Sequence, residues 1–297
     1  MLYPGRRFIV PLIRKCAARA YSDNVAPVTM AYNVFDGKNT DTSQPPFVIM
    51  HGLFGSKQNW RAVGKALQAK TNRKVITVDA RNHGDSPHTD EHSSAHMAAD
   101  IVHLMQQMDI QKVSVMGHSM GGRTMMYMAL KYPQLVESSV IVDISPIHLP
   151  RDFYEMEQIF NAMLSLRVPA ELSMADGRKY AEVEMKKAVA SKETIDFILL
   201  NLRKNPDGTF RWAANVQTLY NHLRSFSDFE SHIAGLEAYQ GRTMFICGNK
   251  SNFVDPKSWP QIQKIFPNSD IHWLDAGHLV HFEQPAKFVE LLVNFLK

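Results

Sequence analysis

Hydrophobic residues along this chain occur in short runs and in longer periodic segments, and the two kinds alternate. The short runs are almost continuously apolar, which is typical of strands that are covered on both faces. They lie at 47–50, 74–78, 113–116, 139–144, 243–247 and 271–274. An earlier run at 28–34 indicates one more strand, antiparallel, at an edge of the same sheet.

The segments between these runs have the apolar spacing of amphipathic helices. They lie at 60–69, 94–108, 120–131, 256–265 and 285–295. Repeated alternation of strand and helix implies right-handed crossovers and helices on both faces of a mostly parallel sheet. The sequence therefore predicts an α/β protein with a doubly wound sheet.

The alternation is interrupted between residues 146 and 239, where we expect helices only. Apolar residues recur on one helical face from Met156 to Leu164, and 180–190 and 194–202 look similar. The tetrapeptide at 205–208, Asn-Pro-Asp-Gly, indicates a turn. We expect a core formed by two stretches and a helical cap inserted after strand six, the strand at 139–144. The core comprises residues 28–145 and 240–297, and the cap comprises residues 146–239.

The composition is that of an ordinary globular protein, with 45% hydrophobic and 21% charged residues among 297. The formal net charge of +4 arises from residues 1–22, which hold five basic and no acidic side chains. The remainder carries 28 basic against 29 acidic side chains. A nearly neutral body without a basic stripe argues against nucleic-acid binding.

Residues 1–22 are arginine-rich, free of acidic residues and dotted with apolar side chains, as mitochondrial presequences are. Arg19-Ala20-Tyr21-Ser22 looks like a matrix-processing site, so we expect a mature chain that starts near Ser22. A secretory signal and a disordered basic tail are the alternatives, and Pro11 would interrupt a presequence helix. The mitochondrial matrix is the expected location, with the cytoplasm as second choice.

The lengths of the apolar runs and the spacing of the cysteines exclude further classes of protein. No run approaches the roughly 20 apolar residues that a membrane-spanning helix needs. The two cysteines, Cys16 and Cys247, form no zinc-binding spacing and no disulfide framework. We therefore expect no metal, no cofactor and no transmembrane segment.

The most specific motif is Gly117-His118-Ser119-Met120-Gly121, which reads Gly-x-Ser-x-Gly. It joins the predicted strand at 113–116 to the predicted helix at 120–131. A serine on such a turn is the nucleophile elbow of sheet hydrolases, with its hydroxyl lifted above the sheet. The turn crowds its neighbours, so positions 117 and 121 must lack a side chain. Ser119 is the predicted nucleophile.

A serine hydroxyl needs a base within reach, and the base needs an orienting carboxylate. His278 follows the last predicted strand in Asp275-Ala276-Gly277-His278, which is the place of the base in this fold class. The chain has thirteen histidines, and we consider four others weaker candidates. His118 points off the elbow, His51 belongs to a glycine-rich loop, and His83 and His281 are expected to shape or line the pocket.

The orienting carboxylate has two candidate places, and the usual one, after strand seven at 243–247, holds Ser251. Asp143 ends strand six, the other position known for the acid, and is the predicted orienting residue. Ser251 is expected to donate a supporting hydrogen bond to the same pair. Asp255 is the reserve acid, and a structural role for Asp143 at the start of the cap is the alternative.

The oxyanion of the tetrahedral intermediate needs two backbone N–H donors. The first is expected from Met120, which follows the nucleophile. The second is expected from Leu53, in the glycine-rich loop at 51–55. Another charged loop, at 79–86, is expected to brace its neighbours through an arginine–carboxylate pair.

Taken together, five blocks resemble the α/β-hydrolase superfamily, and within it the subfamily of α/β-hydrolase domain-containing protein 11 and its bacterial esterase relatives. The blocks are 51–56, 79–87, 117–122, 143–146 and 277–281, and the resemblance spans residues 28–297. It implies a serine esterase of lipid or acyl esters, diacylglycerols included, in mitochondria. It also implies an acid after strand six, a helper serine after strand seven, and association with lipoate-bearing 2-oxoacid dehydrogenase complexes.

These observations predict a carboxylester hydrolase that uses an acyl-enzyme and acts on a small, acylglycerol-like ester. Dehalogenases and epoxide hydrolases of the same fold use an aspartate nucleophile, and position 119 is serine. A thioesterase and a carbon–carbon bond hydrolase remain open. The alternative from another class is a non-catalytic or dual-role protein that stabilises a mitochondrial 2-oxoacid dehydrogenase complex.

Overall fold

The computed structural model describes residues 25–147 and 155–297. The presequence predicted at 1–22 and its processing site lie outside the described residues. The core is a seven-stranded sheet in the order β1-β3-β2-β4-β5-β8-β9. Its strands are β1 (Tyr32–Phe35), β2 (Phe47–Met50), β3 (Val75–Val78), β4 (Val113–His118), β5 (Val136–Val142), β8 (Arg242–Gly248) and β9 (Ser269–Leu274). Strand β1 pairs antiparallel with β3, and the other neighbours pair in parallel.

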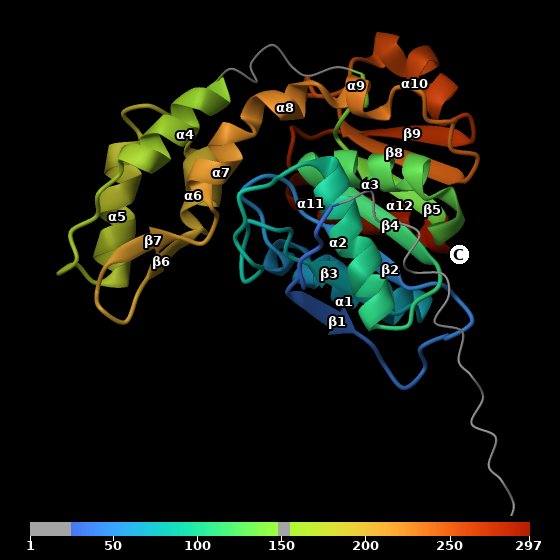
Figure 1. Cartoon of the computed structure of the whole chain (residues 1–297), viewed down its shortest axis with the longest axis horizontal. Helices are drawn as coiled ribbons and strands as arrows, with labels where there is room; N and C mark the ends of the chain where they lie inside the picture. The colour runs from blue at the N-terminus through green and yellow to red at the C-terminus, as the bar shows by residue number, and fades with distance from the viewer. Residues whose placement is uncertain (1–24, 148–154) are drawn as a thin grey trace, which may run out of the picture.

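Helices cover both faces of this sheet (Figure 1). Side chains alternate along β2, so that Val48 and Met50 join one hydrophobic cluster while Phe47 and Ile49 join the other. The first cluster includes side chains of α2 (Ser94–Gln107), α3 (Met120–Lys131), α9 (Phe229–Ile233) and α10 (Trp259–Ile265). The second includes side chains of α1 (Arg61–Thr71), α11 (Val280–Glu283) and α12 (Pro285–Leu296). Because both faces are buried, the central strands are continuously apolar, as their sequences predicted.

Most of the segment between β5 and β8 forms the cap, which lies beside the sheet in Figure 1, whereas α9 at its end packs in the first hydrophobic cluster. Its elements are α4 (Glu155–Ser165), α5 (Met174–Met185), α6 (Lys192–Leu199), β6 (Leu202–Lys204), β7 (Phe210–Trp212), α7 (Val216–Asn221) and α8 (Leu223–Ser227). Most of its buried apolar side chains form a third hydrophobic cluster, which also takes in Phe54 from the loop after β2.

The expectation of a cap made of helices only is wrong, because β6 and β7 form a small antiparallel hairpin. The predicted turn at 205–208 connects the two strands, and Gly208 adopts φ 90° there. Each strand has three residues, too few for an alternating pattern to be recognised in sequence. Trp212 fastens the hairpin to α4 by donating its indole N–H to the carbonyl of Met163 at 2.9 Å.

The other predicted elements are present with bounds shifted by a few residues. In the core, β1 begins four residues later than predicted, and a 3-10 turn at Pro256–Ser258 takes the first three residues of the helix predicted at 256–265. Among the described residues, no helix is long and apolar enough to cross a membrane. Within the same residues, no cluster of histidine, cysteine and acidic side chains is arranged to hold a metal ion.

Candidate active site

Ser119 occupies a sharp turn between β4 and α3 at the carboxyl ends of the parallel strands. Its backbone has φ 51° and ψ −114°, in a region that side-chain-bearing residues rarely adopt. The Ser119 N–H donates to the carbonyl of Val142 on β5 at 3.0 Å, which holds the strained turn to the sheet. The side chain reaches the wall of a cavity that is partly open to solvent.

The glycines on either side of Ser119 are required by contact with neighbouring backbone. A Cβ on Gly117 would lie 2.1 Å from the carbonyl oxygen of Gly121. A Cβ on Gly121 would lie 2.6 Å from the carbonyl oxygen of Met50 on β2. The steric reason predicted for the two glycines of the motif is therefore confirmed.

Asp143 follows β5, the strand next to β4, and its side chain is fully buried. Its Oδ1 accepts from the N–H of Gly248 at 2.9 Å. Its Oδ2 accepts from the Nδ1 of His278 at 2.7 Å and from the hydroxyl of Ser251 at 2.5 Å. Three donors from two segments, the end of β8 with its following loop and the loop after β9, thus fix the carboxylate in a position that orients the imidazole.

His278 lies in the loop after β9, and its side chain retains 28% exposure. With Nδ1 donating to Asp143, its Nε2 is left as the acceptor that a general base requires. Phe253 stacks on the ring with centroids 3.7 Å apart and an interplanar angle of 15°. The main chain is held as well, because His118 donates from Nε2 to the carbonyl of His278 at 2.8 Å.

The reserve acid, Asp255, does not contact His278. It is exposed and caps the 3-10 turn before α10 by accepting from the N–H of Lys257 at 2.9 Å. Asp143 is therefore the carboxylate that the structure brings to the histidine. Ser251 contacts the carboxylate as expected, although its catalytic contribution stays a prediction.

Buried histidines support the walls of the site. His51 donates to the carbonyl of Gly52 and accepts from the N–H of Ala80, and His83 accepts from the N–H of Phe54 at 3.2 Å. His281 stacks on Trp60 with centroids 4.1 Å apart, and burial lowers its pKa to about 3. Burial also lowers the pKa of His118 well below its usual value. These imidazole rings are therefore neutral at physiological pH and have a structural role.

The charged loop at 79–86 contains the expected arginine–carboxylate pair, with a partner from outside the loop. Arg81 binds Asp100 on α2 through two hydrogen bonds of 2.8 and 2.7 Å. Asp79 instead pairs with Lys57, which also reaches Asp85. These contacts tie the segment after β2 to the loop at 79–86.

Leu53 and Met120, the predicted oxyanion donors, both line the cavity beside Ser119. Met120 is the first residue of α3, and the first N–H groups of a helix have no partner within the helix. The loop that carries Leu53 approaches the nucleophile closely, since a Cβ on Gly52 would lie 3.2 Å from the Cβ of Ser119. Their role as donors stays a prediction.

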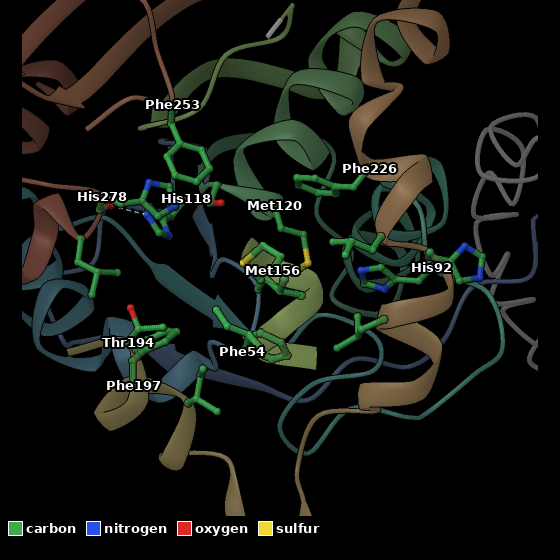
Figure 2. Close-up of a pocket in the computed structure, with 18 of the residues that line it drawn as sticks. Phe54, His92, His118, Met120, Met156, Thr194, Phe197, Phe226, Phe253 and His278 are labelled. Carbon is green, nitrogen blue, oxygen red and sulfur yellow. Dashed lines mark hydrogen bonds between the residues drawn. The ribbon is translucent and has the colours of Figure 1, made fainter. Parts of the chain in front are cut away.

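The cavity has a volume of about 330 Å³ and is enclosed by loops at the carboxyl ends of the strands and by the cap. Figure 2 shows His278, His118 and Phe253 on one side, with Met120, Met156 and Phe54 toward the centre. Cap residues supply much of the wall, including Met156, Ile159, Thr194, Phe197, Ile198, Leu219 and Leu223. Sequence reasoning missed most of these residues, because helical periodicity identifies an apolar face without saying what that face covers.

The comparisons with known proteins agree with this architecture. The family described as alpha/beta hydrolase fold matches residues 45–285, and the chain therefore belongs to that family. The chain is similar to the sn-1-specific diacylglycerol lipase ABHD11 of Danio rerio, with 37% identity over 286 residues, 94% of this chain and 87% of that protein. It is also similar to the Abhydrolase domain-containing protein C22H12.03 of Schizosaccharomyces pombe, with 34% identity, 92% of this chain and 99% of that protein. Among solved structures, a marine microorganism esterase superposes with a TM-score of 0.81 at 27% identity, covering 90% of this chain and 99% of that one.

Proposed function

We propose that this chain is a serine carboxylester hydrolase that cleaves acyl or lipid esters, diacylglycerols among them, through an acyl-enzyme. The observation that carries the proposal is the convergence of Ser119 and the hydrogen-bonded pair of His278 and Asp143 on one apolar cavity. The diacylglycerol lipase and the esterase named above, which this chain resembles, support an ester as the substrate.

In the first half of the reaction, the Ser119 hydroxyl attacks the ester carbonyl while Nε2 of His278 takes its proton. Asp143 stabilises the imidazolium that forms, because its Oδ2 accepts from Nδ1 at 2.7 Å. The N–H groups of Met120 and Leu53 stabilise the oxyanion. Collapse of the intermediate transfers the proton from His278 to the departing alcohol and leaves the acyl group on Ser119.

In the second half, a water molecule gives its proton to His278 and attacks the acyl-enzyme. The same two backbone donors stabilise the second oxyanion. Its collapse breaks the bond to the Ser119 oxygen, His278 returns its proton to that oxygen, and the carboxylic acid leaves. Every proton in this sequence passes through Nε2 of His278, so the chemistry needs no further titrating group. A thioester could react through the same two half-reactions. Thioesters are therefore among the substrates to be assayed.

Labelling with a fluorophosphonate tests the proposal directly, because only an activated serine reacts with this probe. We expect stoichiometric labelling of the wild-type protein and none of Ser119→Ala. Ser258→Ala is a matched control, since that hydroxyl donates to the carbonyl of Asp255 away from the cavity. Full labelling or full esterase activity in Ser119→Ala would refute the mechanism.

We place the enzyme in the mitochondrial matrix, on the strength of the arginine-rich, acid-free residues 1–22. The subfamily resemblance supports a second role there, association with a 2-oxoacid dehydrogenase complex. Fusing residues 1–30 to a fluorescent reporter tests the location, and a diffuse cytosolic signal would argue against it. Affinity capture from mitochondria with Ser119→Ala as bait tests the association separately from catalysis.

A further inference from the structure

Phe253 covers one face of the general base, His278. The two rings stack with centroids 3.7 Å apart and an interplanar angle of 15°. Figure 2 shows the phenyl ring beside the imidazoles of His278 and His118, at the wall of the cavity. Phe253 takes no part in the proton transfers described above, but a contact this close to the proton-carrying ring can act on the reaction through its electrostatics.

The geometry of the stack suits a charged imidazole better than a neutral one. Two neutral aromatic rings prefer an offset or edge-to-face arrangement, with centroids about 4.5–7 Å apart. A centroid separation of 3.7 Å leaves room for only a small offset, because carbon atoms in contact lie about 3.5–4 Å apart. A cation over an aromatic face is instead attracted by the ring quadrupole. The stack therefore gains most when both nitrogens of His278 carry a proton.

One short loop after β8 brings two groups to the catalytic pair. The hydroxyl of Ser251 donates to Oδ2 of Asp143 at 2.5 Å, and the N–H of Phe253 donates to the oxygen of the same hydroxyl at 3.3 Å. The phenyl ring is thus held relative to the carboxylate that binds Nδ1 of His278. Because the ring is already in place before the charge develops, it needs no rearrangement when the imidazolium forms.

The titratable groups that face His278 from other elements are two carboxylates and two neutral histidines. Asp143 approaches from the end of β5 and binds Nδ1. The ring of His118 lies 4.6 Å away, centroid to centroid, at the end of β4, and α11 carries His281 and Glu283, whose carboxylate accepts a backbone N–H just before the base. Burial lowers the pKa of both neighbouring histidines. Within this group, positive charge therefore develops on His278 alone.

We propose that Phe253 is a positioning residue whose aromatic face stabilises the imidazolium that His278 forms in the transition states of both half-reactions. The proposal rests on the proposed function, because His278 acquires this charge by acting as the base. The imidazole is neutral before the proton transfer, so the attraction is stronger in the transition state than in the ground state. An interaction of this kind raises kcat and leaves KM unchanged.

Replacing Phe253 by pentafluorophenylalanine tests the proposal, because fluorine preserves the shape of the ring but removes the negative charge from its face. We expect kcat for p-nitrophenyl acetate to fall about fivefold with KM unchanged, and a singly fluorinated ring should give an intermediate value. The matched control is the same replacement at Phe282, an exposed ring on α11, which should leave kcat unchanged. A kcat equal to that of the wild type after fluorination of Phe253 would overturn the proposal.

The pH profile of kcat/KM separates stabilisation of the charge from simple packing. A ring that attracts the imidazolium also favours the protonated, inactive form of the free enzyme. Weakening this attraction should therefore move the acid limb of the profile to lower pH, by about 0.7 unit for a fivefold effect. If Phe253 acted by contact alone, the limb would stay in place. That result, or a shift to higher pH, would refute stabilisation of the charge.

Two further variants test the same idea without fluorine. Phe253→Leu keeps an apolar side chain without an aromatic face, so kcat should fall by about fivefold or more, and the acid limb should again move to lower pH. Phe253→Tyr keeps the aromatic face and should recover most of the activity that Phe253→Leu loses. Equal kcat values in the two variants would mean that the reaction does not use the aromatic face.

Fluorophosphonate labelling separates failure of this proposal from failure of the proposed function. If the wild-type protein neither cleaves the ester nor reacts with the probe, the esterase mechanism itself fails. If the wild-type protein does both, and its kcat and pH profile are shared by the fluorinated protein and by Phe253→Leu, only the role of Phe253 fails.

Discussion

The carboxyl edge of the sheet and the cap enclose the same cavity, but they hold their residues in opposite ways. At the sheet edge, Ser119 and Asp143 have φ values of 51° and 49°, and backbone hydrogen bonds between neighbouring strands fix both. The cap presents side chains from short helices that pack mainly on one another in a separate hydrophobic cluster. The catalytic residues are therefore positioned by backbone geometry. The shape of the cavity wall is instead set by side chains that can be substituted without changing that backbone.

This difference separates the expected effects of substitution. Changes at the sheet edge should lower the rate for every ester to a similar degree, because they act on steps common to all substrates. Changes in the cap should alter the rate for some esters relative to others, because they act on the shape of the cavity. A cap substitution that lowered the rates for all esters equally would contradict this distinction between the sheet edge and the cap.

The largest effect is expected from Ser119→Ala. Removing the nucleophile should lower kcat by about 10⁶, by analogy with other serine hydrolases. The strained backbone and its bond to Val142 remain, so the melting temperature should stay close to that of the wild type. Steady-state kinetics with short and long esters measure the loss, which should be the same for both. A loss confined to long esters would contradict a common chemical role.

The next effect is expected from Asp143→Asn, which should lower kcat by about 10⁴. An amide at this position cannot hold the Nδ1-protonated tautomer of His278 as a carboxylate does. Asp255→Asn is the matched control, because Asp255 is exposed and caps a turn, and its kcat should stay within about twofold of the wild type. If Asp255→Asn were inactive and Asp143→Asn active, the acid would have to be reassigned.

The sheet edge was also the part of the molecule that sequence predicted well. Ser119, Asp143 and His278 each directly follow or closely follow a strand, and parallel strands bring such residues to one edge. Packing contacts between loops that carry no motif were not predictable, and the stacking of Phe253 on His278 is an example. The hairpin of β6 and β7 was missed because its strands are short and its pairing depends on packing against α4.

In the cap, Phe197→Ala should change which ester is preferred. Phe197 lines the cavity from α6 and is only partly buried, so its truncation should enlarge the cavity at modest cost in stability. Ratios of kcat/KM for branched or long acyl groups over acetyl should rise about 10- to 100-fold. A p-nitrophenyl ester series measures the ratios. Val183→Ala on the exposed face of α5 is the control and should leave the profile unchanged. An unaltered profile in Phe197→Ala would mean that α6 does not select the substrate.

The smallest effect concerns stability and comes from His281, which lies beneath the sheet edge against Trp60. Its pKa is about 3 in the folded protein, whereas the unfolded chain binds a proton near pH 6.5. Acid therefore favours the unfolded chain: the free energy of unfolding should fall as the pH drops below about 6.5, and fall further toward pH 3. One such histidine contributes a slope of about 1.4 kcal/mol per pH unit in this window.

His281→Phe should remove that share of the slope while keeping the stack on Trp60. Urea unfolding between pH 7.5 and 5 measures the change, and Phe282→Leu at the exposed neighbouring position should retain the wild-type slope. The variant should therefore lose less stability than the wild type on acidification. Equal slopes in the two proteins would mean that His281 is protonated as readily in the folded as in the unfolded chain. Solvent would then reach the region beneath the sheet edge, contrary to the burial of His281 in the structure.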